Sequence, residues 1–374
     1  MHCFWERRQL YIPRPEIRFG ILILEKMSRI YFVLAIIIGL ITLEFLVFNL
    51  FLFEKELENE AFFENLKNQI LSSFILNKIQ EKNSEITIFV VGDIMLDRGV
   101  EYKIGEEGKG DYSFPFLKIA EELRRADFVF GNLEGPISDK GQKVGSIYSF
   151  RADPKAVEGL KYAGFDILSV ANNHIFDYGR EAMEDTFKRL KEAGIEYVGG
   201  GFDEKEAYSP LIKEINGTKI GFLAYNDLGP EVWKATEGKS GIARIDEKNL
   251  EKIKKGIEAA KQKSDVLIVS LHSGEEYAAN PTSFQTSFAR FAIDTGADLV
   301  VGHHPHVVQK IERYKDGWIA YSLGNFVFDQ NFSANTMEGS NLKITIKNKK
   351  IESIFPQKIK ISDSFQPILS KIIN

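Results

Sequence analysis

Three of the six histidines in this chain lie within four residues, in the sequence Gly-His-His-Pro-His at 302–306. The apolar run Leu299–Val301 comes immediately before them and is typical of a short buried strand. Pro305 stiffens the turn and limits how far His304 and His306 can separate. Imidazole is a common ligand of Zn, Mn, Fe and Ni, so this turn could supply two metal ligands. A basic surface turn is the alternative interpretation.

Short apolar runs alternate with amphipathic segments along most of the chain. The runs typical of strands are Ile86–Val91, Phe128–Phe130, Ile167–Val170, Ile220–Tyr225, Val266–Leu271, Leu299–Val301 and Trp318–Ser322. The segments typical of helices are Pro115–Arg125, Pro154–Ala163, Gly179–Ala193, Glu247–Lys263 and Ser283–Thr295. This alternation predicts an α/β domain around a largely parallel, buried sheet.

Residues able to bind metals follow several of the predicted strands. They are Asp93, Asn132, Glu134, Asn173, His174 and His272. In parallel α/β sheets the ligand site lies outside the carboxyl ends of the strands. Asn and Asp also favour turns and helix N-caps, so one such turn would be ordinary. Their repetition together with histidine favours convergence on a metal site.

Composition limits the kinds of site and partner. The chain has 374 residues, 44% of them apolar, which is enough for a large core. A formal net charge of −5 argues against nucleic-acid binding. Cys3 is the single cysteine, so neither a disulfide framework nor a thiolate metal site is available. Oxygen and imidazole ligands favour Mn, Zn, Fe or Mg.

The N-terminal region contains a segment with the composition of a membrane anchor. Ile30–Phe53 is 24 residues long with Glu44 as its one charged residue, which is enough to cross about 30 Å of hydrocarbon. Its N-terminal flank is rich in arginine, whereas its C-terminal flank, from Glu54 to Glu58, is acidic. The positive-inside rule therefore predicts a cytoplasmic N-terminus and an extracytoplasmic main domain. No small-residue cleavage site follows, which favours an uncleaved signal anchor.

The remaining boundaries follow from pattern changes along the chain. Residues 1–29 are expected to be cytoplasmic, and 1–26 to be an upstream mis-start before Met27. Residues 54–84 are amphipathic and predict a helical stalk, although they could instead pack on the domain or on lipid. Residues 85–340 form the predicted catalytic or binding domain. Residues 341–374 alternate around Asn348–Lys350 and predict a C-terminal β-hairpin extension.

Six motifs in unbroken order, between Ile86 and Gln330, resemble those of the CapA family of capsule and poly-γ-glutamate synthesis proteins. They are Val91–Leu96, Gly131–Pro136, Ser149–Ala152, Ala171–Gly179, Gly302–His306 and Ser322–Phe326. The family is related to the calcineurin-like metallophosphoesterases. The resemblance therefore implies a four-layer sandwich, two sheets flanked by helices, with a dinuclear metal site at the strand ends.

The resemblance also implies a set of metal ligands. Asp93 stands at the first aspartate ligand, but Met95 occupies the place of an expected histidine. Either Asn132 or Glu134 stands at the bridging carboxylate, and Glu134 is chemically the better bridge. The remaining ligands would be Asn173, His272, His304 and His306, and they would hold one or two divalent ions: Mn, Fe or Zn, with Mg as a further candidate. His303 falls on the usual glycine and is expected to support or pack beside a ligand.

Other motif positions would act on the substrate. His174 would be the general acid, assisted by Asp177. Asp177 and Asn325 could orient ligand imidazoles, with Asn325 also at the substrate side. Arg151 could hold an anionic group through its guanidinium, or it could be a solvated surface arginine. Glu276 and Tyr277 are expected at the rim of the site.

Two classes of function remain open from the sequence. The first is a metal-dependent hydrolase or transferase, anchored in the bacterial cell membrane and acting on an anionic polymer such as poly-γ-glutamate or capsular polysaccharide. The second is a non-catalytic, polymer-binding component of a capsule synthesis or export complex. Met95 gives weight to the second class, because losing an imidazole weakens one metal position. The resemblance implies capsule or poly-γ-glutamate biosynthesis under either class.

Overall fold

The computed structural model describes residues 34, 38–39, 42–46, 65–73, 85–144 and 147–370. The chain divides into two units, Met1–Ile79 and Gln80–Asn374. In the first unit the described residues are all helical. Within the described residues, no helix is both long enough and apolar enough to cross a membrane. The predicted cytoplasmic segment 1–29 lies outside the described residues, as do most of the predicted anchor 30–53 and stalk 54–84.

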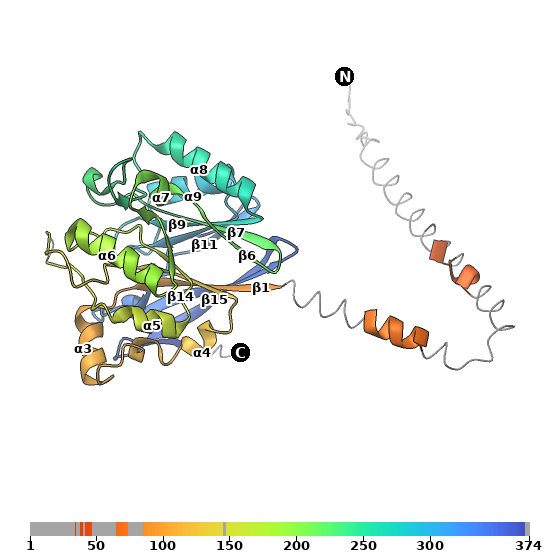
Figure 1. Ribbon diagram of the computed structural model, residues 1–374, viewed down its shortest axis with the longest axis horizontal. Helices are drawn as coiled ribbons and strands as arrows, with labels where there is room; N and C mark the ends of the chain where they lie inside the picture. Colours follow the sequence, from red (N-terminus) through yellow and green to blue (C-terminus); the bar gives the residue numbers. More distant parts are fainter. Residues whose placement is uncertain are drawn as a thin grey trace, which may run out of the picture. The chain divides into compact units, whose positions relative to one another are not determined.

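The second unit contains two large mixed sheets (Figure 1). The strands of the first sheet are β1 (Ile86–Ile94), β2 (Phe128–Leu133), β3 (Ile167–Ser169), β4 (Glu196–Val198), β13 (Asn325–Val327), β14 (Glu338–Lys347), β15 (Lys350–Ile361) and β16 (Pro367–Leu369). Their order is β16-β15-β14-β1-β2-β3-β4, and β13 also pairs with β1. Strands β1 to β4 are parallel, whereas β14, β15 and β16 are antiparallel additions.

The second sheet has the order β11-β12-β10-β9-β7-β6. Its strands are β6 (Leu211–Ile215), β7 (Thr218–Asn226), β9 (Val266–His272), β10 (Leu299–His303), β11 (Ile311–Tyr314) and β12 (Gly317–Ala320). The central strands are parallel, and β6 and β11 are antiparallel edges. A small ladder joins β5 (Gly200–Gly201) to β8 (Gly241–Ile242).

Helices cover the outer face of each sheet (Figure 1). The first sheet packs against α3 (Arg98–Glu106), α4 (Ala120–Leu123), α5 (Ala156–Ala163) and α6 (Gly179–Glu192). The second sheet packs against α7 (Glu204–Tyr208), α8 (Leu250–Lys263) and α9 (Ser283–Thr295). Three 3₁₀ turns complete the unit: η1 (Phe114–Phe116), η2 (Glu231–Trp233) and η3 (Asn335–Met337). The predicted α/β sandwich is thus confirmed.

Successive side chains of the central strands point to opposite faces of the sheet. Both faces are buried, which explains why these strands are continuous apolar runs in the sequence. In β1, Ile88 and Val90 point toward the second sheet, whereas Phe89 and Val91 point toward the helices. In β7, Phe222 faces the first sheet and stacks on Phe128 and Phe130 with ring centroids 5.6 Å apart in each case. The apolar layer between the sheets therefore fixes how their strand ends meet.

Two predicted elements differ in detail from the structure. The segment Pro115–Arg125 is two pieces, η1 and α4, because Ile119 leaves the helical region at φ −129°. The predicted C-terminal hairpin turns at Asn348 and Lys349, both with positive φ as such tight turns require. Its first strand, β14, begins at Glu338 and pairs with β1, so β14, β15 and β16 belong to the first sheet.

Replacing Phe222 by alanine should destabilise the domain by about 3–5 kcal/mol, because it leaves a cavity in the layer between the sheets. Phe222 is only 1% exposed and contacts two further phenylalanines. Urea unfolding of the full-length chain measures the change. Phe355→Ala is the matched control, since Phe355 is 47% exposed. Equal losses in both variants would contradict the assigned core.

Candidate metal centre

The carboxyl ends of strands from both sheets carry the candidate ligands. Asp93 lies near the end of β1, Asn132 near the end of β2, and Glu134 one residue beyond β2. His272 is the last residue of β9, and the loop after β10 supplies His304. Gly92 allows β1 to approach the loop before β13, since a Cβ there would lie 2.0 Å from the Gly324 carbonyl oxygen. Backbone packing of strands thus brings the polar side chains together.

Two buried carboxylates form the floor of the site. The Asn132 amide donates to Asp93 Oδ1 at 2.8 Å and to Glu134 Oε2 at 3.1 Å. Asn172 Nδ2 in turn donates to Asn132 Oδ1 at 3.2 Å, which fixes the amide orientation. Asn132 therefore holds both carboxylates with its nitrogen, and Glu134 occupies the position suited to a bridge.

The protein shifts the pKa values of the two carboxyls in opposite directions. Burial opposes ionisation of Asp93, but the nearby His303 and His306 outweigh it and hold the Asp93 pKa well below its usual range. Burial and then the charges of Asp93 and Glu276 raise the Glu134 pKa well above its usual range. A cation beside Glu134 would reverse this penalty and favour the carboxylate.

Three imidazoles surround one oxygen of Glu134. Glu134 Oε1 lies 3.6 Å from His306 Nε2, 3.9 Å from His174 Nε2 and 4.0 Å from His272 Nε2. It is fully buried and has no hydrogen-bond partner among the described residues. Buried polar atoms are nearly always paired, so this oxygen marks a place that a cation would fill.

Two overlapping sets of side chains could each hold a metal ion, and they share Glu134. One set is Glu134, His304 and His306, and the other is Asp93, Glu134 and His272. Within each set the ligand atoms lie within 4.8 Å of one another. Imidazole and carboxylate donors suit divalent Mn, Fe or Zn. The residues present therefore fit a metal centre in which Glu134 is shared.

Burial keeps two of the imidazoles in the neutral form that metals require. Burial, followed by the charge of His306, lowers the His304 pKa to about 3. Burial, followed by the charge of His304, also holds the His272 pKa well below its usual range. His272 Nε2 lies 2.7 Å from Asn173 Oδ1, so the predicted asparagine ligand sits beside the predicted histidine ligand.

The His-x-His turn is held in a strained backbone conformation. His304 has φ +96° and His306 has φ +58°, a region that non-glycine residues rarely adopt. The His304 backbone amide donates to Asp93 Oδ2 at 3.2 Å. Asn325 Oδ1 lies 3.0 Å from His306 Nδ1, and His306 Nδ1 also lies 3.5 Å from Asp93 Oδ2. The surrounding structure therefore fixes both rings toward the carboxylates.

His174 and Asp177 form a pair at the edge of the centre. His174 Nδ1 lies 2.7 Å from Asp177 Oδ2, and Asp177 also accepts a hydrogen bond from the Phe150 backbone amide. The Phe150 ring lies 4.1 Å from the imidazole. This arrangement fixes the ring and leaves His174 Nε2 directed toward the centre, where a general acid would be needed.

Two residues near the centre, Met95 and His303, are not placed as metal ligands. Met95, which replaces an expected histidine, is fully buried in the apolar core beside α3, so it offers nothing to the centre. Its sulfur instead accepts from the Asp97 backbone amide at 3.1 Å. His303 is fully buried with Nδ1 3.2 Å from Asp93 Oδ1, which places it behind the first aspartate.

A cavity of about 840 Å³ opens onto the centre. Its lining includes the predicted site residues Asn173, His174, Asp177, Glu276, Tyr277, His304 and His306. Arg151 is not among the described residues that line it. The Arg151 guanidinium donates to the Lys140 and Gly141 carbonyls and lies 4.1 Å from the Tyr178 ring centre. Asn325 is likewise absent from the described lining and acts through His306.

The structure adds site residues that the sequence does not indicate. Arg98 lines the cavity, is ion-paired with Asp329 and lies 4.6 Å from the Phe150 ring centre. Arg98 follows the loop at the carboxyl end of β1, and this position in the sequence could have indicated that it is a site residue. Trp233 and Phe332 also line the cavity. They come from segments without a motif, so nothing in the sequence marks them.

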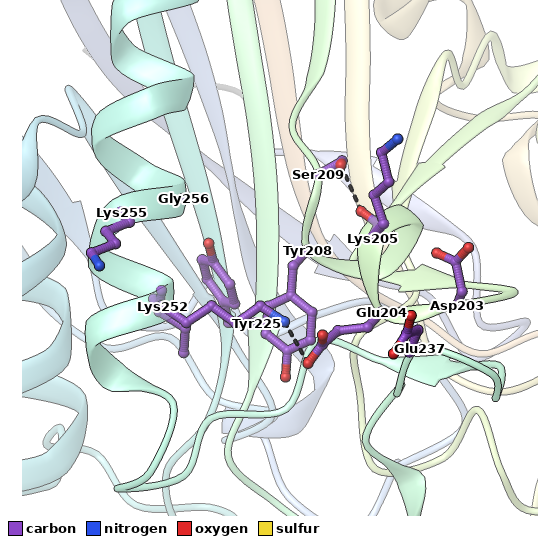
Figure 2. Close-up of a pocket in the computed structure, with 11 residues that line it drawn as sticks. Asp203, Glu204, Lys205, Tyr208, Ser209, Tyr225, Glu237, Lys252, Lys255 and Gly256 are labelled. Carbon is purple, nitrogen blue, oxygen red and sulfur yellow. Dashed lines mark hydrogen bonds and ion pairs between the residues drawn. The ribbon is translucent and has the colours of Figure 1, made fainter.

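A second cavity, of about 650 Å³, lies between α7 and α8 (Figure 2). Lys252 of α8 forms an ion pair with Glu204 of α7 and lies 4.4 Å from the Tyr208 ring centre. The described residues that line this cavity include no histidine. This cavity contains a solvated ion pair beside aromatic rings, whereas the candidate metal ligands belong to the larger cavity.

Comparison with known proteins identifies relatives of most of this domain. Residues 87–330 match the family described as "Bacterial capsule synthesis protein PGA_cap". The chain is 37% identical to the capsule biosynthesis protein CapA of Bacillus anthracis over 257 residues, 67% of this chain and 62% of that protein. It is 35% identical to the PGA biosynthesis protein CapA of Bacillus subtilis, over 65% of this chain and 63% of that protein. The matches span less than two thirds of either relative.

Solved structures show more distant similarity. A phosphatase from Mycoplasma pneumoniae matches with a TM-score of 0.46 and 17% identity, covering 74% of this chain and 94% of that one. The NAD nucleotidase of Haemophilus influenzae matches with a TM-score of 0.44 and 12% identity, covering 78% of this chain and 54% of that one.

Glu134→Gln should remove a pH-dependent loss of stability from the metal-free chain. Because the Glu134 pKa is raised by folding, the folded chain holds this proton more tightly than the unfolded chain. The resulting stabilisation is complete below the unfolded pKa and is lost as pH rises through the folded one. Thermal melting in EDTA from about pH 4 to pH 8 should show a steeper fall for wild type than for the variant.

The matched control for this measurement is Glu237→Gln, which neutralises an exposed carboxylate of the second cavity that is not among the groups raising the Glu134 pKa. It should keep the wild-type pH dependence. Melting curves that shift in parallel for wild type and Glu134→Gln would show that Glu134 is ordinarily ionised in the metal-free fold.

Proposed function

Because this chain belongs to the PGA_cap family of bacterial capsule synthesis proteins, we propose that it is a metal-dependent hydrolase or transferase acting on an anionic polymer of capsule or poly-γ-glutamate biosynthesis. The observation that supports the chemistry most directly is Glu134 Oε1, which has no hydrogen-bond partner in the described part of the chain, is shared by two possible ligand sets and lies 3.9 Å from His174 Nε2. The names of the two curated relatives support the biological setting.

The proposed chemistry divides between the metal ligands and the acid pair. Asp93, Glu134, His272, His304 and His306 would hold one or two divalent ions, with Asn173 beside His272. A bound divalent cation supplies Lewis acidity to a phosphoryl or carbonyl oxygen and activates water for attack. These five ligands differ in task from His174 and Asp177, which would act on the leaving group.

His174 would deliver a proton to the leaving group through Nε2. Asp177 accepts from Nδ1–H, which keeps the proton-donating nitrogen on the side of the cavity and stabilises the imidazolium before transfer. Phe150 packs on the ring and limits its rotation. Asn325 holds the His306 imidazole, and Asn132 holds the two carboxylates. Most of the site is therefore preorganised before substrate binds.

We also propose that the domain lies outside the cytoplasm, tethered to the bacterial cell membrane by residues 30–53. The support is the apolar length of this segment, its arginine-rich N-terminal flank and its acidic C-terminal flank. Such a tether would hold the cavity close to a membrane synthase or export complex that delivers the polymer.

A non-catalytic role in holding the polymer is the second candidate, and Met95 is the observation that favours it. The first metal position lacks the imidazole expected there, and Met95 is buried in the core instead. A site with one weak metal position could bind an anionic chain without cleaving it. The two candidates differ in whether His174 is needed for more than binding.

Removing a ligand imidazole should remove metal. Inductively coupled plasma mass spectrometry of the dialysed full-length chain is expected to find one to two equivalents of Mn, Fe or Zn, with at least about tenfold weaker retention in His304→Ala and His306→Ala. His174→Ala is the matched control, because His174 lies outside both ligand sets and should retain the metal. A folded parent that takes up no metal on reconstitution would contradict the proposal.

Removing the acid should remove turnover while metal remains. In a screen of phosphoesters and γ-glutamyl amides, His174→Ala should lower kcat by about 10²- to 10⁴-fold at unchanged metal content. Asp177→Asn should lower kcat less, because it disturbs the tautomer and orientation of the ring rather than removing it. Unchanged polymer binding with no turnover in wild type or either variant would favour the holding role.

A further inference from the structure

Aromatic side chains make up much of the outer wall of the metal-site cavity. Tyr148, Tyr277 and Phe332 line it and are 61%, 43% and 63% exposed. Trp233 lines it as well, with its ring stacked on Phe176 at 5.2 Å and an interplanar angle of 3°. Phe176 follows His174 by two residues, so Trp233 lies on the side of the proposed acid. Exposed aromatic surface of this kind usually marks a binding site.

Two of these rings are held beside the metal-binding turn. The Tyr277 ring lies 6.1 Å from the His306 ring and 5.1 Å from the Phe332 ring, the latter edge to face at 89°. Gln330 Nε2 donates to the Tyr277 hydroxyl at 3.2 Å. The Tyr277 backbone is at φ +64°, and its amide donates to the Pro305 carbonyl at 2.8 Å. The aromatic wall is therefore tied to the same turn that carries the ligands.

Positive charge is scarce on this wall. Among the described residues that line the cavity, Arg98 is the one lysine or arginine, and it is ion-paired with Asp329. The lining carboxyls Asp177, Glu276 and Asp329 outnumber it. A polymer with a carboxylate on every unit would therefore find no unpaired lysine or arginine in the described lining, and the exposed Glu276 would repel its carboxylates.

We propose that the unit next to the reacting group is a neutral sugar ring, so that the substrate is a polysaccharide whose sugars are joined through phosphodiesters. This inference rests on the proposed function, since the phosphate would occupy the metal centre. The C–H face of a pyranose packs against the electron-rich face of an aromatic ring. The ring hydroxyls could donate to Glu276, an exposed carboxylate of the same lining.

Calorimetric titration of the metal-loaded, full-length chain tests this directly. The probes are two oligomers of equal length, a phosphodiester-linked glucose oligomer and a γ-linked glutamate oligomer, at about 0.15 M salt. The glucose oligomer is expected to bind at least about tenfold more tightly. Phe332→Leu should weaken its binding about fivefold, as expected for the loss of one stacking ring.

Phe355→Leu is the matched control, because it removes an exposed phenylalanine from β15, away from the cavity lining. It should leave the affinity for the glucose oligomer within about twofold of wild type. Equal or tighter binding of the glutamate oligomer would overturn the inference in favour of a peptide polymer. So would the same small effect from Phe332→Leu and Phe355→Leu.

Metal content and phosphoester turnover, measured on the same preparations, separate this inference from the proposed function. Full metal content and turnover without preference for the glucose oligomer would overturn the sugar assignment and leave the hydrolase intact. A preference that persists in a chain without metal or turnover would support the sugar assignment and remove the hydrolase. The two outcomes are distinguishable, because one is measured as affinity for the oligomers and the other as metal content and turnover.

Discussion

The burial of one carboxylate oxygen, Glu134 Oε1, is the constraint on which the other features of the site depend. Glu134 Oε1 lies where the strand ends of both sheets meet, with His306, His174 and His272 around it and no partner among the described residues. An ionised carboxylate in such a place is costly unless a cation neutralises it. The carboxylates, the imidazoles of His272 and His304, whose pKa values burial lowers, and the strained turn at His304 are explained together by one metal centre, whereas each alone would lower stability.

Two supports of this centre lie on strands. Asn132 of β2 donates to both carboxylates, and Asn325 of β13 lies beside the His306 imidazole. The interlocking phenylalanines between the sheets hold these strand ends at a constant separation. Farther out, the cavity wall is built from connecting segments. Tyr277 of this wall donates through its backbone amide to Pro305, so the wall is tied to the turn that carries His304 and His306.

Much of the metal centre could be predicted from the sequence, because Asp93, Glu134, His272 and His304 each follow an apolar run. Parallel strands bring such positions to one edge, and the structure brings these four together. The choice between two arginines could not be predicted. Arg151 stacks on Tyr178 and binds carbonyls, whereas Arg98 lines the cavity, and both outcomes depend on side-chain directions set by distant packing. Of the aromatic wall, Tyr277 is expected at the rim from the sequence, whereas Tyr148, Trp233 and Phe332 lie outside the sequence motifs and could not be predicted.

The position of β1 in its sheet has a consequence for how the protein matures. Strand β1 is the first strand of the domain, yet its antiparallel partner is β14, and Ile86 pairs with Ile346 near the other end of the chain. Such distant pairing slows folding, because a long loop must close before the contact forms. The strand that carries Asp93 therefore stays unpaired on one side until nearly the whole chain is available. Premature termination or proteolytic trimming near residue 340 would therefore disrupt the candidate metal centre although all of its residues precede the cut.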